Sequence, residues 1–176
     1  MKILKTALLA FTFILLSCDE EDSSSDINFN QTISTTLNVD ITEDSNGQPV
    51  SFSEVETVDF TTIQQIQDNI DDIQNASIDA LSFEVDGFTG AANAVVTSAS
   101  ISFDGSVIQV SDIDLEQADN DNTLFPIDEP SALTAIENAL QNNTQATVTL
   151  QGTIDSAPAS FDVIIYLDVT VTASAG

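Results

Sequence analysis

Hydrophobic and polar residues alternate with a period of two over most of the chain beyond residue 31. This alternation predicts strands that bury one face and expose the other. The first strand is expected at residues 33–41, where aliphatic residues alternate with Ser, Thr, Asn and Asp, and an Asn46-Gly47 turn signal follows it. Three further strands are expected at residues 81–85, 146–154 and 161–171.

Two Asp-Gly pairs mark expected turns. Asp86-Gly87 is expected to end one strand, and Asp104-Gly105 forms the tip of the clearest predicted hairpin. Beyond that hairpin, Ile113 and Leu115 would reach the solvent face if the strand simply continued. A bulge or strand break near Ser111-Asp112 would return them to the core. The two-residue turn pairs Phe103 with Ser106, Ile101 with Ile108 and Ala99 with Val110.

Two stretches show helical spacing instead. One carries isoleucine at positions 63, 66, 70 and 73, with Gln and Asp on the opposite side. The other has Asp128 or Glu129 near its start and Pro130 in its first turn, and it ends at Asn142-Asn143. Its apolar face carries Leu133, Ile136 and Leu140.

The order of these elements indicates an α+β domain, mostly antiparallel β. Sandwich-like sheets are expected to carry the two amphipathic helices packed on one side. Ile164 and Tyr166 make the second face of the last strand apolar at its middle, so a helix is expected to cover them.

Nearly all charges of the chain are negative. All 29 acidic residues follow Cys18, both basic residues (Lys2 and Lys5) precede it, and there is no histidine. Nucleic acids and anionic lipid headgroups are held mainly by Lys and Arg, so the domain is expected to bind neither. Catalytic triads are excluded because they need His, and Lys nucleophiles are excluded as well. The domain is therefore expected not to be an enzyme, and a carboxylate-based hydrolase is the catalytic alternative left open.

The chain begins with a signal-like segment. Two lysines precede an apolar stretch at residues 7–16, which is too short to span a membrane but typical of a secretory signal. Cys18, the only cysteine, follows Leu15-Leu16-Ser17, and this LLSC motif resembles the lipobox of bacterial lipoproteins. The resemblance implies cleavage before Cys18 and acyl chains, such as palmitate, attached to it. The alternative is an ordinary signal peptide with a chance cysteine.

An acidic cluster, Asp19-Glu20-Glu21-Asp22, follows the cysteine. It resembles the export signal of Bacteroidota surface lipoproteins, which implies a surface-exposed outer-membrane protein. Asp beside the cysteine also resembles the inner-membrane retention signal of proteobacterial lipoproteins, and the composition alone fits a flexible tether. The expected segments are a signal peptide (1–17), a lipidated acidic tether (18–30) and one β-rich domain (31–176).

The domain contains two candidate sites. Residues 119–123 are expected in the loop before the second helix, where Asp119, Asp121 and nearby Asp128 offer oxygen ligands that suit calcium. The alternative is a solvated polar loop. Asp155-Ser156-Ala157 resembles the O-glycosylation motif of secreted Bacteroidota proteins, which implies a glycan on Ser156. The alternative there is an ordinary turn.

These features together indicate a non-catalytic lipoprotein held on the membrane by its N-terminal lipid. Its domain is expected to bind or scaffold an extracellular protein or a glycan. A calcium-stabilised adhesion module and a carboxylate-based hydrolase are the alternatives. No nucleic-acid partner is expected, and no cofactor other than calcium.

Overall fold

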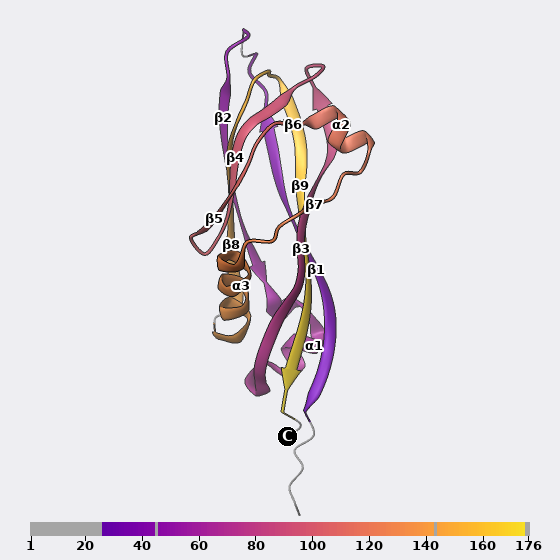
Figure 1. Cartoon of the computed structure of the whole chain (residues 1–176), viewed down its shortest axis with the longest axis vertical. Coiled ribbons are helices and arrows are strands. Elements are labelled where there is room, and N and C mark those ends of the chain that lie inside the picture. Colours follow the sequence, from indigo (N-terminus) through magenta and orange to yellow (C-terminus); the bar gives the residue numbers. More distant parts are fainter. Residues whose placement is uncertain (1–25, 45, 143, 175–176) are drawn as a thin grey trace, which may run out of the picture.

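The computed structural model describes residues 26–44, 46–142 and 144–174. The elements in chain order are β1 (Ile27–Ile41), β2 (Val50–Asp59), α1 (Gln64–Asp68), β3 (Ile73–Gly90), β4 (Val95–Phe103), β5 (Ser106–Val110), β6 (Ile113–Asp114), α2 (Leu115–Asn120), β7 (Phe125–Pro126), α3 (Pro130–Asn142), β8 (Gln145–Ile154) and β9 (Ala159–Ala173). Two 3-10 turns, Phe60–Thr62 and Ile70–Asp72, flank α1. Sheet A has the strand order β1-β9-β3-β7, and sheet B has the order β2-β8-β4-β5 with β6 paired to β4. The two sheets pack face to face, which confirms the predicted α+β, sandwich-like class (Figure 1).

Alternating apolar residues of both sheets fill the space between them. Every second residue of β9, from Ala159 to Ala173, is buried, and so are four residues of β8. The rings of Phe52 in sheet B and Phe161 in sheet A meet edge to face, with centroids 5.8 Å apart. Each fully buried aliphatic or Phe side chain contributes about 1.5–3 kcal/mol. These rows therefore hold the two sheets together, as the period of two predicted.

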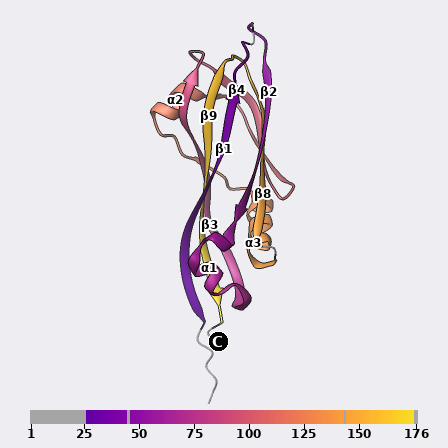
Figure 2. The same ribbon diagram turned by 180° about the vertical axis from the view of Figure 1, so that it is seen from behind.

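The strands connect the sheets in a regular way. The connections β1–β2, β3–β4 and β8–β9 each pass from one sheet to the other, and all three lie at the same end of the sandwich (Figures 1 and 2). At the opposite end Ile27, the first residue of β1, pairs with Ala173, the last residue of β9. A strand of 15 residues spans about 50 Å. The first and last strands therefore begin and end together, at the end opposite the three connections.

The predicted hairpin is confirmed residue by residue. Asp104 and Gly105 have φ angles of 45° and 92°, the left-handed values that a two-residue turn requires. The observed β4–β5 register matches the predicted pairs throughout. A break at Asp112, with φ of 58°, separates β5 from β6 and returns Ile113 and Leu115 to the core.

The second predicted helix is confirmed as α3, and the first is wrong in length. Helix α3 buries Ile136 and Leu140 and packs against β3, β5 and β8. The isoleucine stripe instead forms the five-residue α1 between 3-10 turns, with only Ile66 fully buried. Asn69 ends α1, and Ile73 pairs with Ala173 as the start of β3. Short helices rich in Asn and Asp have marginal stability. Ile73, the last isoleucine, therefore pairs in a strand and does not extend the helix.

Two strand boundaries and one whole strand also differ from expectation. Asp86-Gly87 lies at a register shift inside β3, a bulge where Gly87 has φ of 66°, and does not end the strand. Strand β1 begins at Ile27, so residues 27–30 of the expected tether belong to the sandwich. Strand β2 escaped prediction because Glu54 and Glu56 interrupt its inward row between Phe52 and Val58.

The expected helix over Ile164 and Tyr166 is wrong. Both residues are half-buried, and the described helices pack mainly on β3, β5 and β8. Tyr166 lies between Ser34 of β1 and Ser82 of β3, and its hydroxyl donates a hydrogen bond to Glu84. An aromatic side chain with an apolar body and a bonded polar tip is stable in such a half-exposed position.

Gly152 tests the packing of sheet B. A Cβ atom there would lie 2.5 Å from Cζ of Phe52 and 3.0 Å from Cβ of Ala99. We expect Gly152→Ala to lower the free energy of unfolding by about 1–3 kcal/mol in urea denaturation. Combining it with Phe52→Leu should cost less than the sum of the two single changes, because the second change makes room. An unaltered unfolding midpoint for Gly152→Ala would contradict this packing.

Candidate functional site

The residues of the predicted anchor lie outside the described residues: Cys18, Asp19, Glu20, Glu21 and Asp22. None of the helices that the structure describes is long and apolar enough to cross a membrane.

The carboxylates predicted to bind calcium are not brought together. Asp119 lies in the last turn of α2, not in a loop, and its Oδ1 accepts a hydrogen bond of 2.8 Å from the backbone N–H of Gly87. Asp121 accepts at 3.5 Å from Gln117, and Asp128 lies exposed before α3. Within the described residues, no three acidic side chains form a group that could hold a metal ion. Asp119 therefore ties α2 to the bulge of β3. Calcium binding by Asp119, Asp121 and Asp128 remains a prediction.

Ser156 lies half-buried in the turn between β8 and β9, so the expected turn is present. The preceding residue has a structural role. The Oδ1 of Asp155 accepts a hydrogen bond of 2.9 Å from the N–H of Val95, and the N–H of Asp155 donates to the carbonyl of Val95 at 3.0 Å. The turn is thereby fixed to the start of β4, and a glycan on Ser156 remains a prediction.

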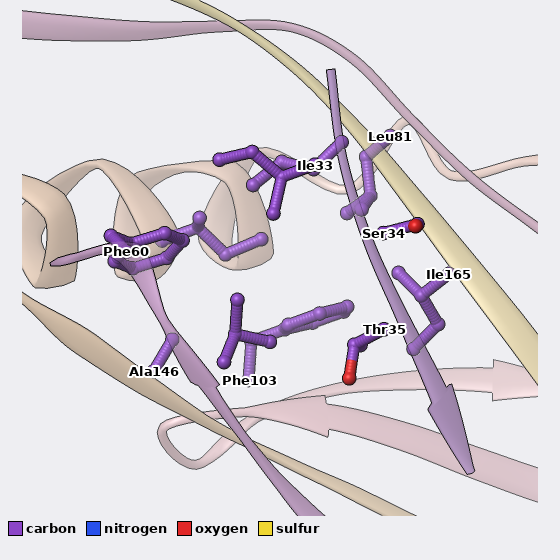
Figure 3. A pocket seen from close by; sticks show the side chains of 11 residues that line it. Ile33, Ser34, Thr35, Phe60, Leu81, Phe103, Ala146 and Ile165 are labelled. Carbon is purple, nitrogen blue, oxygen red and sulfur yellow. The ribbon is translucent and has the colours of Figure 1, made fainter. Parts of the chain in front are cut away.

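The interior offers little room for a ligand. A cavity of about 20 Å³ lies between the sheets, where Ile33, Phe60, Leu81 and Phe103 converge (Figure 3). A second cavity of about 20 Å³ lies beside Phe52. Pockets for small molecules usually measure about 300–1,000 Å³. An apolar cavity of this size stays dry, since a water molecule there would lack polar partners. Both cavities are gaps in core packing.

The outer face of sheet A is acidic, and its polar side chains bind one another. Thr32 donates a hydrogen bond of 2.7 Å to Asp168, and Asn38 donates one of 2.6 Å to Asp162. The remaining pairs are Thr170 with Asp79 and Asn30, Thr172 with Asn28, and Tyr166 with Glu84. Neutral hydroxyls and amides thus take the place that Lys and Arg hold in other proteins.

Hydrogen bonds of this kind shift two pKa values. The bond to Glu84 raises the pKa of Tyr166, and burial and the charges of Glu84 and Asp86 act in the same direction. Hydrogen bonds from the side chains of Thr61 and Gln145, and from the backbone of Thr61, lower the pKa of Asp59.

The middle of the outer face of sheet B is uncharged and hollowed. A shallow hollow of about 410 Å³ lies over β2, β4, β5 and β8. Its ten lining residues include no acidic residue, although the chain contains 29. Seven of them present hydroxyl or amide groups: Ser51, Ser53, Ser98, Ser100, Gln109, Gln151 and Thr153.

The polar side chains of this hollow lack partners within the described protein. Within the described residues none of the seven side chains makes a hydrogen bond to the protein, and only the backbone carbonyl of Thr153 accepts one, of 3.2 Å from the hydroxyl of Thr97. The corresponding side chains of sheet A are cross-linked in pairs. Their donors and acceptors point outward and are free to bind an added molecule. This hollow is the candidate binding site of the domain.

No family model matches the chain, and no curated protein is significantly similar to it.

Tyr166 allows a direct test of the sheet A face, because it is the only tyrosine of the chain. Its absorbance titration should have a midpoint above 10, and Glu84→Gln should move the midpoint toward the ordinary value, near 10. A raised folded-state pKa stabilises the fold below the unfolded pKa, and the effect is lost as pH rises through the folded pKa. Equal midpoints for the wild type, Glu84→Gln and the urea-unfolded chain would contradict the bond.

Proposed function

We propose that this chain is a lipoprotein anchored through Cys18 to the outer membrane, and that its sandwich domain binds an extracellular partner on the cell surface without catalysis. The arrangement of the strand ends carries the proposal. Strand β1 starts at Ile27, close behind Cys18 in sequence, and pairs there with the end of β9. The anchor would therefore join one end of an elongated domain, while the connections β1–β2, β3–β4 and β8–β9 lie at the opposite end.

This geometry leaves both sheet faces accessible beside the membrane. A strand of 15 residues extends about 50 Å from the attachment point. A lipid anchor with two or more acyl chains holds a protein stably, so the domain needs no contact of its own with the bilayer. The acidic surface supports this reading, because anionic headgroups would repel it.

A non-catalytic role is supported by the kind of site that the domain offers. The candidate binding hollow on sheet B contains only uncharged polar and apolar residues. General acid-base catalysis and nucleophilic catalysis both need a titratable or activated group close to the substrate. Hydroxyls and amides without such a group can bind and orient a partner.

The anchor is tested with two variants of the full chain expressed in bacterial cells. Cys18→Ala should reduce incorporation of labelled palmitate to background, since the acceptor sulfur is lost. Alanine at all of residues 19–22 should leave labelling intact but protect the domain from protease added to intact cells. Palmitate labelling of Cys18→Ala would contradict lipidation at this site. Equal protease accessibility with and without the acidic cluster would contradict its role in export.

A further inference from the structure

The polar side chains on the two outer faces of the sandwich differ in their hydrogen bonding. On sheet A, carboxylates such as Asp168 and Asp162 accept hydrogen bonds from neutral side chains of the neighbouring strand. On sheet B, the hollow has no carboxylate, and its hydroxyls and amides bind no other described side chain. The donors and acceptors on the outer face of sheet B are therefore available to a ligand, whereas those of sheet A are already paired with one another.

The uncharged surface extends beyond the hollow along the strands. The antiparallel registers place its residues in three successive rows across the sheet. In the third row Val55 and Val107, on the two edge strands, are 61% and 51% exposed, which places an apolar side chain at each end of that row. The rows are Ser51, Thr153 and Ser98; Ser53, Gln151, Ser100 and Gln109; and Val55, Thr149, Ser102 and Val107.

We infer that this hollow binds a neutral glycan segment, an inference that rests on the proposed binding function and names its ligand. A neutral sugar carries hydroxyls that both donate and accept, as do the Ser and Thr hydroxyls and the Gln amides of the hollow. Its C–H surfaces can pack on Val55 or Val107 at the ends of the third row. The hollow measures about 410 Å³, within the range of small-ligand sites, and its open shape suits a chain that passes through it.

Charge and composition decide against other ligands. The 29 acidic residues after Cys18 repel an anionic polymer, but a neutral one approaches without electrostatic cost. Protein-binding surfaces are enriched in aromatic residues and Arg and depleted in Ser, whereas four of the ten lining residues here are Ser. Without an aromatic platform each contact is weak, so a long polysaccharide that engages many anchored copies gains by multivalency.

The inference is tested by affinity electrophoresis of the full chain, purified in mild detergent whether or not it is lipidated. Native gels contain dextran, mannan, laminarin or xyloglucan as neutral polymers, or alginate as an acidic one. We expect at least one neutral polymer to retard the wild type, and alginate to have no effect. Gln151→Leu should weaken retardation about tenfold, the effect of losing one or two hydrogen bonds. Gln48→Leu is the matched control: Gln48 lies exposed in the β1–β2 connection and does not line the hollow, so this variant should behave as the wild type.

Three results would overturn the glycan site. The first is a mobility that none of the four neutral polymers changes, and the second is equal retardation of the wild type and Gln151→Leu. The third is a dimer in light scattering that becomes monomeric in Gln151→Leu, because this would assign the face to a protein contact. Ser53→Leu on edge strand β2 provides a second variant if Gln151→Leu fails to fold. The assay needs no membrane, so a negative result would not contradict lipidation of Cys18 or surface exposure. Conversely, evidence against lipidation or surface exposure would not contradict the glycan site.

Discussion

Repulsion between carboxylates, with no cationic side chain to offset it, is the constraint that shapes this domain. No Lys, Arg or His occurs after Cys18, so no ion pair with a basic side chain can form within the sandwich. Two kinds of interaction compensate. Alternating apolar rows of both sheets bury their side chains against each other, and carboxylates such as Asp168, Asp104 and Asp119 accept hydrogen bonds from hydroxyls or backbone N–H groups.

The same constraint explains how the surface is divided. Carboxylates that share a face need neutral donors between them, and on sheet A Thr32, Asn38 and Thr170 donate to Asp168, Asp162 and Asp79. Sheet B avoids the problem because the three rows that cross its middle contain no acid. Its polar groups are consequently free, and a neutral ligand can approach them without meeting a charged side chain.

The sequence predicted those features that depend on local periodicity and turn chemistry. The Asp104-Gly105 turn set the β4–β5 register, and the parity slip located the break at Asp112. Helix α3 followed from its proline start and apolar spacing. Long-range pairing decided what was missed: Ile73 joins β9 and leaves the isoleucine helix, and β1 extends back to Ile27 because β9 offers partners there.

The binding surface was harder to predict than the core. The acid-rich segment at residues 119–123 suggested calcium, but α2 turns Asp119 toward Gly87. The feature that indicates the binding surface is instead the lack of Asp and Glu at the solvent-facing positions in the middle of four strands. It became meaningful only when the registers placed Ser53, Gln151 and Ser100 side by side.

The dependence of thermal stability on salt tests the role of carboxylate repulsion most directly. The melting temperature of the full chain in nonionic detergent would be followed as NaCl rises from about 0.01 to about 0.15 M, where the Debye length falls from about 30 to about 8 Å. Because the folded state holds its charges closer together than the unfolded chain, screening should raise the melting temperature gradually. Low concentrations of calcium should act no differently from magnesium. A melting temperature that stays constant or falls over this range would contradict repulsion as the governing constraint.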